Sequence, residues 1–353
     1  MGGKVNVILS DREARACETF RRGLEEGSGE KWEVWACVSN KGRSRGYNVI
    51  RYFKYLFFPL LAYLRRRRYG TVFAWQSFYA VGFAFYARLL GGRVENRVVG
   101  RNLVYRAKKG LLGRIYRKWV RFATGGRLRE EYLVSAVAYR EVLSAGTGID
   151  RERLTFIPFG KEDFTEMPEA GAERKENRDW EAGSYLLALG RSNRDYDWLV
   201  ESVVGTGRRV HIVSDEYRPK GALPENVRVS GHLSGLEVLP YLRDSLALVF
   251  PIQDGTTTAG ETVLMLGYMF SKPAVVTGPS LLAEDYVEDG RTGLVIPKTG
   301  KALRGALERL EREEGLAARL GAAARETYER KYSEEDYGRR VGCWLAETRR
   351  EQK

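Results

Sequence analysis

The fold is decided by the stretch FPIQDGTTTAGETVLMLGYMFSKPAVVTGPSLLAEDYVEDGRTGLVIP, which occupies residues 250–297. An apolar run over residues 246–251 leads into it and has the length of a buried strand. A loop of small residues follows at 254–260, then an apolar helical run at 262–270 and a second buried strand at 273–277. A strand, a short loop, a helix and a strand in this order predict a parallel βαβ unit.

The loop of this unit has the composition of an anion-binding site. Small residues leave backbone N–H groups accessible at the start of the helix, where the helix dipole also favours negative charge. The hydroxyl groups of Thr256, Thr257 and Thr258 add further donors. The loop therefore predicts a binding site for a diphosphate, although a small-residue loop is also an ordinary feature of any βαβ unit.

The residues downstream favour the diphosphate site over an ordinary βαβ loop. Lys272-Pro273 leads into Ala-Val-Val-Thr, and then come Glu284-Asp285 and the run Asp-Gly-Arg-Thr-Gly-Leu-Val-Ile-Pro at 289–297. This order resembles the donor-site end of glycosyltransferase family 4, whose members are retaining nucleotide-sugar enzymes of the GT-B fold. The resemblance implies two Rossmann-like α/β domains facing a central cleft, with a nucleotide-diphosphate sugar bound to the C-terminal domain.

The chain departs from the family at two acidic positions. The family carries a glutamate in the loop and another in the helix, and alignment on Lys272 puts Thr258 and Leu266 at these positions. Glu261 and Asp254 are the carboxylates close by, and which of them, if either, replaces the missing contacts is left open. The family's first-domain histidine is absent as well.

The start of the second half supplies cationic candidates. A buried strand over 184–190 ends in Gly-Arg, which resembles the family segment that holds the donor diphosphate with an arginine and a lysine. The lysine is absent, so the role falls to Arg191 and, in second place, to Arg194, because guanidinium groups bind phosphate bidentately. A solvated loop that caps the next helix is the structural alternative. The resemblance implies Arg191, Arg194 and Glu261 as catalytic residues, and as donor-binding residues Gly190, Ser192, His232, Leu233, Asp254, Gly255, Thr256, Thr257, Thr258, Gly260 and Thr262.

Composition limits the class of protein. A chain of 353 residues suits two domains, and 43% hydrophobic with 30% charged residues is typical of globular proteins. No run of about twenty apolar residues occurs, so no membrane-spanning helix is expected. Cys17, Cys37 and Cys343 lack metal-ligand spacing and fit reduced thiols in a cytoplasm. The sequence has 2 histidines, which argues against a histidine metal site or a histidine triad.

The first half also alternates strands with helices, in the order of a Rossmann-like domain. The first turn, at residues 10–13, lacks a Gly-x-Gly-x-x-Gly fingerprint, so we expect no dinucleotide there and no dehydrogenase activity. Strand-like runs occur at 4–9, 32–38, 71–75, 133–135 and 154–160, and helical runs at 11–25, 77–90 and 137–146.

The net charge of +13 suggests nucleic acid, anionic lipid or a phosphorylated substrate as a partner, and two stretches concentrate it. Residues 47–68 are rich in large apolar side chains and end in four arginines, which fits a core helix or an interfacial helix that Pro59 should kink or split. Residues 101–122 contain a basic amphipathic pattern. Its apolar residues are Leu111, Leu112, Ile115, Trp119 and Phe122, and its basic residues are Arg114, Arg117, Lys118 and Arg121.

In family members that act on lipid-linked acceptors, the first domain carries such a patch. The resemblance therefore implies a peripheral enzyme at the inner, cytoplasmic face of a membrane, bound to its anionic surface. We rank nucleic acid lower, because no nucleic-acid-binding module is recognisable. Polar side chains that follow strand-like runs are the acceptor-side candidates, namely Gln76, Arg101, Asn102 and Tyr105.

These observations predict an acceptor-binding domain over 1–160, a linker over 161–183, a donor domain over 184–330 and a C-terminal helix over 331–353 that crosses back to the first domain. The expected reaction moves a hexose, with retention, from a nucleotide sugar to a glycan or lipid-linked hydroxyl, as in cell-surface polysaccharide or glycolipid synthesis. No cofactor is expected, and no metal either, because the helix end and the arginines neutralise the diphosphate. The alternatives are a catalytically degenerate membrane-associated scaffold and a nucleotide-sugar epimerase of the same fold.

Overall fold

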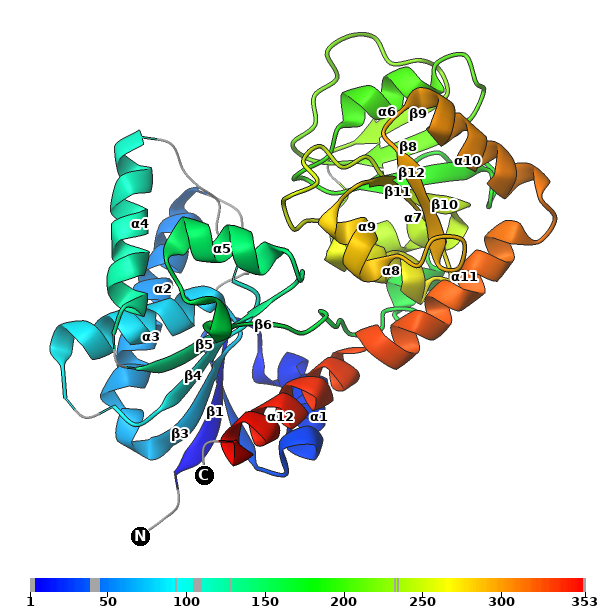
Figure 1. Ribbon diagram of the computed structural model, residues 1–353. Helices are drawn as coiled ribbons and strands as arrows, with labels where there is room; N and C mark the ends of the chain where they lie inside the picture. Colours follow the sequence, from blue (N-terminus) through cyan, green and yellow to red (C-terminus); the bar gives the residue numbers. More distant parts are fainter. Residues whose placement is uncertain are drawn as a thin grey trace. The chain divides into compact units, whose positions relative to one another are not determined.

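The computed structural model describes residues 4–38, 45–92, 94–103, 110–126, 128–231, 233 and 235–351. The chain forms two compact units. Unit 1 comprises Met1–Pro158 and Glu334–Lys353, and unit 2 comprises Phe159–Ser333. Each unit has a six-stranded sheet with helices between the strands, and the strand pairs of the described residues are parallel (Figure 1). The predicted α/β fold with two Rossmann-like domains is therefore confirmed.

The sheet of unit 1 has the strand order β2-β1-β3-β4-β5-β6. Its strands are β1 Val5–Ser10, β2 Trp32–Ala36, β3 Tyr69–Ala74, β4 Arg97–Gly100, β5 Arg129–Val134 and β6 Leu154–Phe156. Its helices are α1 Glu18–Ser28, α2 Arg45–Leu64, α3 Ser77–Leu90, α4 Gly110–Thr124, α5 Tyr139–Thr147 and α12 Glu334–Arg350.

The C-terminal helix α12 packs along α1, and the two lie side by side (Figure 1). Glycines on both helices make the close approach possible, since a Cβ on Gly342 would lie 2.6 Å from the carbonyl oxygen of Leu24. Gly23, Gly27 and Gly338 are in equally close contact with the opposite backbone. Buried Phe20 and Tyr337 continue this contact into the core on one face of the sheet.

Three features of unit 1 differ from the prediction. The helix expected at 11–25 begins only at Glu18, because Ser10 Oγ accepts a hydrogen bond from the Arg12 N–H (2.9 Å) and turns the chain first. Helix α2 runs through Pro59 without a break, although a split or kink was expected there. The short strand β4 was not predicted, since four residues carry little periodic signal.

Unit 2 has the strand order β12-β11-β10-β7-β8-β9. Its strands are β7 Tyr185–Leu189, β8 Arg209–Val213, β9 Val227–Ser230, β10 Ala247–Phe250, β11 Ala274–Gly278 and β12 Gly293–Pro297. Its helices are α6 Tyr196–Val203, α7 Leu239–Asp244, α8 Glu261–Met269, α9 Leu281–Tyr286, α10 Gly300–Arg312 and α11 Leu316–Thr327. The βαβ unit predicted from residues 246–277 is present as β10, α8 and β11, with β10 and β11 paired in parallel.

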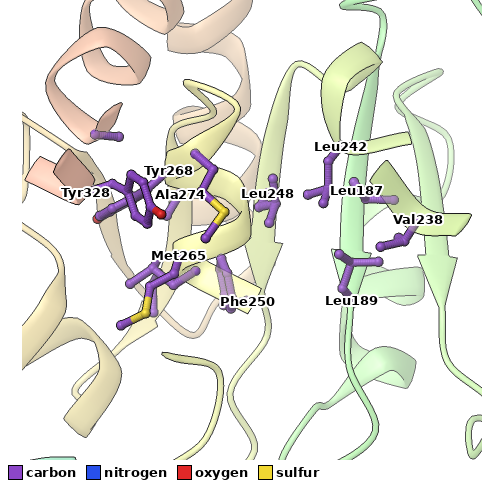
Figure 2. Packing of buried hydrophobic residues seen from close by; sticks show 14 of the residues in the cluster. Leu187, Leu189, Val238, Leu242, Leu248, Phe250, Met265, Tyr268, Ala274 and Tyr328 are labelled. Atoms are coloured by element: carbon purple, nitrogen blue, oxygen red, sulfur yellow. The ribbon is translucent and has the colours of Figure 1, made fainter. Parts of the chain in front are cut away.

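Side chains of successive strand residues point to opposite faces of this sheet and build two cores. Leu187 and Leu189 of β7 share one core with Met265 of α8, and Figure 2 shows them beside Leu248 and Phe250 of β10. The alternate residues of β7, Leu186 and Ala188, face the other core with α6 and α10. Burial on both faces explains why these strands read as continuous apolar runs.

The linker expected at 161–183 is instead an integral part of unit 2. Trp180 and Ala170 are each 4% exposed and belong to its core. The Arg174 guanidinium forms an ion pair with Asp244 at 2.9 Å, and the N–H of Lys175 donates to the Tyr241 hydroxyl. A polar, proline-containing composition suggested a linker, but these buried contacts fold the segment onto the sheet.

Candidate functional site

The predicted donor site lies at the topological switch point of unit 2. Strand β7 pairs with β10 on one side and with β8 on the other, so the chain leaves the two neighbouring strands β7 and β10 in opposite directions. Ligands of open parallel sheets bind beside the carboxyl ends of the strands at such a point. The loops at 190–195 and 251–260, which hold most of the predicted donor residues, follow these two strands.

Asn193 ties the two loops together. Its side-chain oxygen accepts from the Asp254 N–H at 2.7 Å, and its Nδ2 donates to the Asp254 carbonyl oxygen at 2.8 Å. The N–H of Asp195 donates to the Pro251 carbonyl oxygen at 2.7 Å. Asn193 adopts φ 60°, a left-handed conformation that asparagine tolerates better than most residues. The loops therefore form one assembly.

The Asp254 carboxylate organises its own loop. It accepts hydrogen bonds from the hydroxyl groups of Thr256 (2.7 Å) and Thr257 (2.7 Å) and from the Thr256 N–H (2.9 Å). These bonds, that of Thr257 first, lower the pKa of Asp254. Two of the three predicted hydroxyl donors are thus engaged within the loop. Thr258 differs, because its Oγ1 is buried and has no hydrogen-bond partner in the described part of the chain.

Arg194 is a buried cation beside this loop, and its side chain is 9% exposed. Its Nε donates to the Leu189 carbonyl oxygen at 3.3 Å, and Nη1 donates to the carbonyl oxygen of Ser192 at 3.3 Å and, more weakly, to that of Asn193. Burial lowers the pKa of Arg194, against the opposing effects of Tyr196 and Glu261. Within the described ranges no carboxylate forms an ion pair with it. A buried charge that is not held in an ion pair is costly, so this guanidinium is suited to an anionic ligand.

The Arg194 Nη2 lies between two glycines, one from each loop. A Cβ on Gly260 would lie 2.9 Å from Nη2, and a Cβ on Gly190 would lie 3.4 Å from it. Both glycines have a positive φ, 113° for Gly260 and 126° for Gly190, and residues other than glycine adopt such values only with strain. Gly255 of the same loop contacts the Pro279 carbonyl oxygen so closely that no side chain would fit.

Helix α8 begins immediately after Gly260, without a side-chain cap. Its first turn presents the N–H groups of Glu261, Thr262 and Val263, which have no intrahelical acceptor. Thr262 is exposed and Glu261 half-buried. The start of α8, Arg194 Nη2 and the loop therefore meet at Gly260. The helix start and the guanidinium favour a negatively charged ligand there, and the Glu261 carboxylate opposes it.

The other predicted donor residues are placed less favourably. Arg191 is exposed and forms an ion pair with Asp215, which follows β8, so the arginine expected to be the main phosphate ligand already has a counter-charge. Ser192 is half-buried and its carbonyl accepts from Arg194, while Leu233 packs against the core. His232 lies outside the described residues.

Asp195 and Asp197 have the Asp-x-Asp spacing and were not among the predicted site residues. Asp195 caps α6 by accepting from the Trp198 N–H (3.1 Å) and pairs with Lys298 at 2.7 Å. Asp197 pairs with Lys220 at 2.7 Å. Each carboxylate thus has its own lysine, and the described residues contain no group of three or more metal-ligating side chains.

A second polar cluster lies at the switch point of unit 1, between β1 and β3. The Gln76 amide donates to Asp11 Oδ2 at 2.9 Å, and Asp11 is 1% exposed. Burial raises the pKa of Asp11, while Gln76 and Arg101 act in the opposite direction. The Arg101 guanidinium lies 3.8 Å from the ring centroid of Trp75. Three of the four predicted acceptor-side residues therefore follow β3 or β4 here, as Asn102 comes next to Arg101.

Asn102 adopts φ 50°, and its Oδ1 is buried without a hydrogen-bond partner in the described ranges. Tyr105, the fourth candidate, lies outside those ranges. Asp11 was not predicted. Its position directly after β1, at the carboxyl edge of the sheet, is the signal that could have identified it.

The comparisons with solved structures assign the GT-B fold. A glycosyltransferase from Rickettsia africae matches with a TM-score of 0.65 at 13% identity and covers 100% of both chains. Sucrose-phosphate synthase from Thermosynechococcus elongatus matches with a TM-score of 0.67 at 13% identity, over 99% of this chain and 100% of that one. HepE from Anabaena in complex with UDP-glucose matches with a TM-score of 0.63 at 12% identity, over 97% and 99% of the chains.

A UDP-GlcNAc 2-epimerase from Methanocaldococcus jannaschii shares the fold at a lower TM-score of 0.52, with 12% identity over 98% of this chain and 100% of that one. No protein-family model matches the sequence, and the search of curated proteins found no match. At these identities the likeness defines the fold, and the site residues must carry any statement about function.

Proposed function

We propose that the protein is a glycosyltransferase that moves a hexose from a nucleotide-diphosphate sugar to an acceptor hydroxyl. The observation that carries the proposal is the buried guanidinium of Arg194, which forms no ion pair within the described ranges and lies beside the start of α8, where no side chain caps the helix. A diphosphate supplies negative charge and accepts hydrogen bonds from Arg194 Nη2, the first N–H groups of α8 and the Thr258 hydroxyl. The structural likeness to HepE in complex with UDP-glucose supports this ligand class.

The same groups would promote the reaction. When the bond from the anomeric carbon to the diphosphate breaks, negative charge develops on the leaving oxygen, and fixed donors stabilise it. The acceptor oxygen then forms the new bond on the same face of the sugar, and its proton passes to the leaving phosphate, which gives retention. This mechanism, suggested by the resemblance to glycosyltransferase family 4, requires neither an enzyme nucleophile nor a metal.

Of the two carboxylates considered for sugar or ribose contacts, Glu261 is the better candidate. Glu261 stands in the first turn of α8, directly after Gly260, and its charge acts on Arg194. We therefore assign Glu261 to the hydroxyl groups of the donor, and we assign Arg191 to a supporting role through its pair with Asp215.

We further propose that the acceptor is a glycan or lipid-linked glycan at an anionic membrane surface. Arg114, Arg117, Lys118 and Arg121 are exposed on α4 and form no ion pair with any carboxylate in the described ranges. Leu111 and Ile115 on the same helix are 66% and 54% exposed. Exposed apolar and basic side chains on one helix fit the interface of an anionic bilayer. Among the described residues, no helix is both long and apolar enough to span a membrane. The free cysteines fit the reducing cytoplasmic side, where we place the enzyme.

Thermal shifts with uridine-, guanosine- and adenosine-diphosphate sugars test the proposal, followed by donor hydrolysis and transfer assays. We expect one nucleotide to raise the melting temperature of the wild type and to lose this effect in Arg194→Gln. Binding without hydrolysis or transfer would favour the degenerate scaffold, and interconversion of the free nucleotide sugar would favour the epimerase. No stabilisation by any of the three would overturn the donor site.

A further inference from the structure

Unit 1 contains an aromatic pocket that the proposed transfer reaction does not use. It has a volume of about 250 Å³ and opens between α2, α3 and α4, which lie next to one another in Figure 1. Its lining is apolar and aromatic, and includes Tyr55, Leu56, Phe78, Tyr86 and Trp119. An apolar pocket of this kind is suited to a hydrocarbon ligand.

The pocket walls are held by ring contacts. The ring of Phe78 on α3 stacks on Tyr55 of α2, with centroids 5.9 Å apart and an angle of 9° between the planes. It also stacks on Trp119 of α4, with centroids 6.4 Å apart and an angle of 22°. The Tyr86 hydroxyl donates to the Leu56 carbonyl oxygen at 3.2 Å, which directs this polar group to the backbone of α2. The ring faces are therefore left to an apolar occupant.

The surface around the pocket is apolar and cationic. Leu56, which lines it, is 50% exposed, and Phe53 and Phe57 of the same helix are 60% and 50% exposed. Arg51 lies 5.8 Å from the ring centroid of Tyr52, a lining residue, and its Nε is buried without a hydrogen-bond partner in the described ranges. Together with the basic side chains of α4, which form no ion pair within the described part of the protein, this arrangement matches a hydrocarbon chain with an anionic head group.

We propose that the aromatic pocket takes one hydrocarbon chain of an anionic membrane lipid, whose phosphate is bound by Arg51. The inference deepens the proposed membrane association, on which it rests. Contact with the bilayer through α2 and α4 brings the lipid to unit 1, and withdrawal of a single chain into the pocket adds a stoichiometric binding site to a diffuse surface attraction.

The test measures binding of monomeric dodecyl phosphate by titration calorimetry, with inorganic phosphate and dodecyl maltoside as separate probes. We expect saturable binding of one dodecyl phosphate, weaker binding of dodecyl maltoside and none of inorganic phosphate. Leu56→Trp fills the pocket and should weaken binding at least tenfold, because each methylene left in water costs about fourfold in affinity. Leu61→Trp is the matched control, since Leu61 is 45% exposed on the same helix and does not line the pocket. Arg51→Gln should weaken binding of dodecyl phosphate and leave that of dodecyl maltoside unchanged.

Flotation on vesicles of phosphatidylglycerol and phosphatidylcholine separates the two proposals. Protein that floats but binds dodecyl phosphate without saturation, or equally well as Leu56→Trp and Leu61→Trp, overturns the pocket and leaves the membrane association standing. Protein that does not float overturns the membrane association itself. Melting temperatures of both tryptophan variants within a few degrees of the wild type would show that the fold is retained. Stabilisation by the nucleotide sugar, measured on the same variants, reports on unit 2 independently.

Discussion

Asn193 and Asp254 are joined by two hydrogen bonds, from the Asp254 N–H to Asn193 Oδ1 at 2.7 Å and from Asn193 Nδ2 to the Asp254 carbonyl oxygen at 2.8 Å. They connect the loops that follow β7 and β10. Asn193→Gly keeps the left-handed backbone and removes both bonds. We expect the free energy of unfolding to fall by about 1–3 kcal/mol and the affinity for the nucleotide sugar to fall with it. Urea unfolding measures the stability and calorimetry the affinity. Unchanged affinity would mean that this loop connection does not contribute to nucleotide-sugar binding.

Arg194 and Arg191 should respond differently to substitution. Arg194→Gln removes the buried cation and is expected to weaken binding of the nucleoside diphosphate by roughly 10–100-fold, while the stability of the free protein stays within about 1 kcal/mol. Arg191→Gln is the comparison, because Arg191 is exposed and paired with Asp215. Its effect should stay below about fivefold. A larger loss in Arg191→Gln than in Arg194→Gln would reverse the assignment.

Gly260 combines a positive φ with close neighbours, since a Cβ there would lie 2.8 Å from Leu282 Cδ2 and 2.9 Å from Arg194 Nη2. Gly260→Ala should therefore lower the free energy of unfolding by about 2–4 kcal/mol and displace the guanidinium. Gly290→Ala is the control, because Gly290 has φ 74° but nothing within 4 Å of its added Cβ. It should cost about 1 kcal/mol and leave nucleotide binding intact. Equal losses of stability would mean that backbone strain alone decides the effect.

Glu130 makes the stability of unit 1 depend on pH. It is 1% exposed, and burial raises its pKa from 4.5 to about 7, against the opposing effect of its ion pair with Arg153. Between these values the folded state holds a proton that the unfolded state has lost. The free energy of unfolding therefore falls as pH rises from about 4.5 to 7, by at most about 3 kcal/mol, and this contribution is constant above that range.

Glu130→Gln removes this titration. Urea unfolding at pH 5 and pH 8 should show that the free energy of unfolding of Glu130→Gln, relative to the wild type, increases as pH rises. Glu141→Gln, at an exposed position, should show no such change. A wild-type-to-variant difference that is the same at both pH values would contradict the raised pKa.

The four basic residues of α4 that form no ion pair within the described ranges should dominate binding to anionic vesicles. Replacing Arg114, Arg117, Lys118 and Arg121 by glutamine is expected to reduce flotation on phosphatidylglycerol vesicles at least a hundredfold, since each basic residue near the surface contributes about 1 kcal/mol. The control removes the same charge from paired arginines of unit 2, namely Arg309, Arg312, Arg325 and Arg330. Equal loss in both variants would mean that net charge, rather than α4, governs binding.

Much of the structure around the candidate donor site could be predicted from the sequence, because its signals are local. The apolar run before residue 251, the small-residue loop and the apolar helical run correspond to β10, its loop and α8 within one or two residues. Parallel strands buried on both faces require such apolar runs, and the approach of Arg194 to Gly260 requires a residue without a side chain.

Only the tertiary structure decided which polar groups remain available. The sequence by itself determined two alternating α/β halves and a GT-B architecture with a small-residue loop before α8. It could not show that Arg194 is buried while Arg191 is exposed and paired, or that Asp254 accepts hydrogen bonds from two threonine hydroxyl groups. Nor could it place Trp180 in a core. Burial and counter-charges arise from residues far apart in the chain, such as Arg191 and Asp215 on neighbouring strand ends, and no local pattern encodes them.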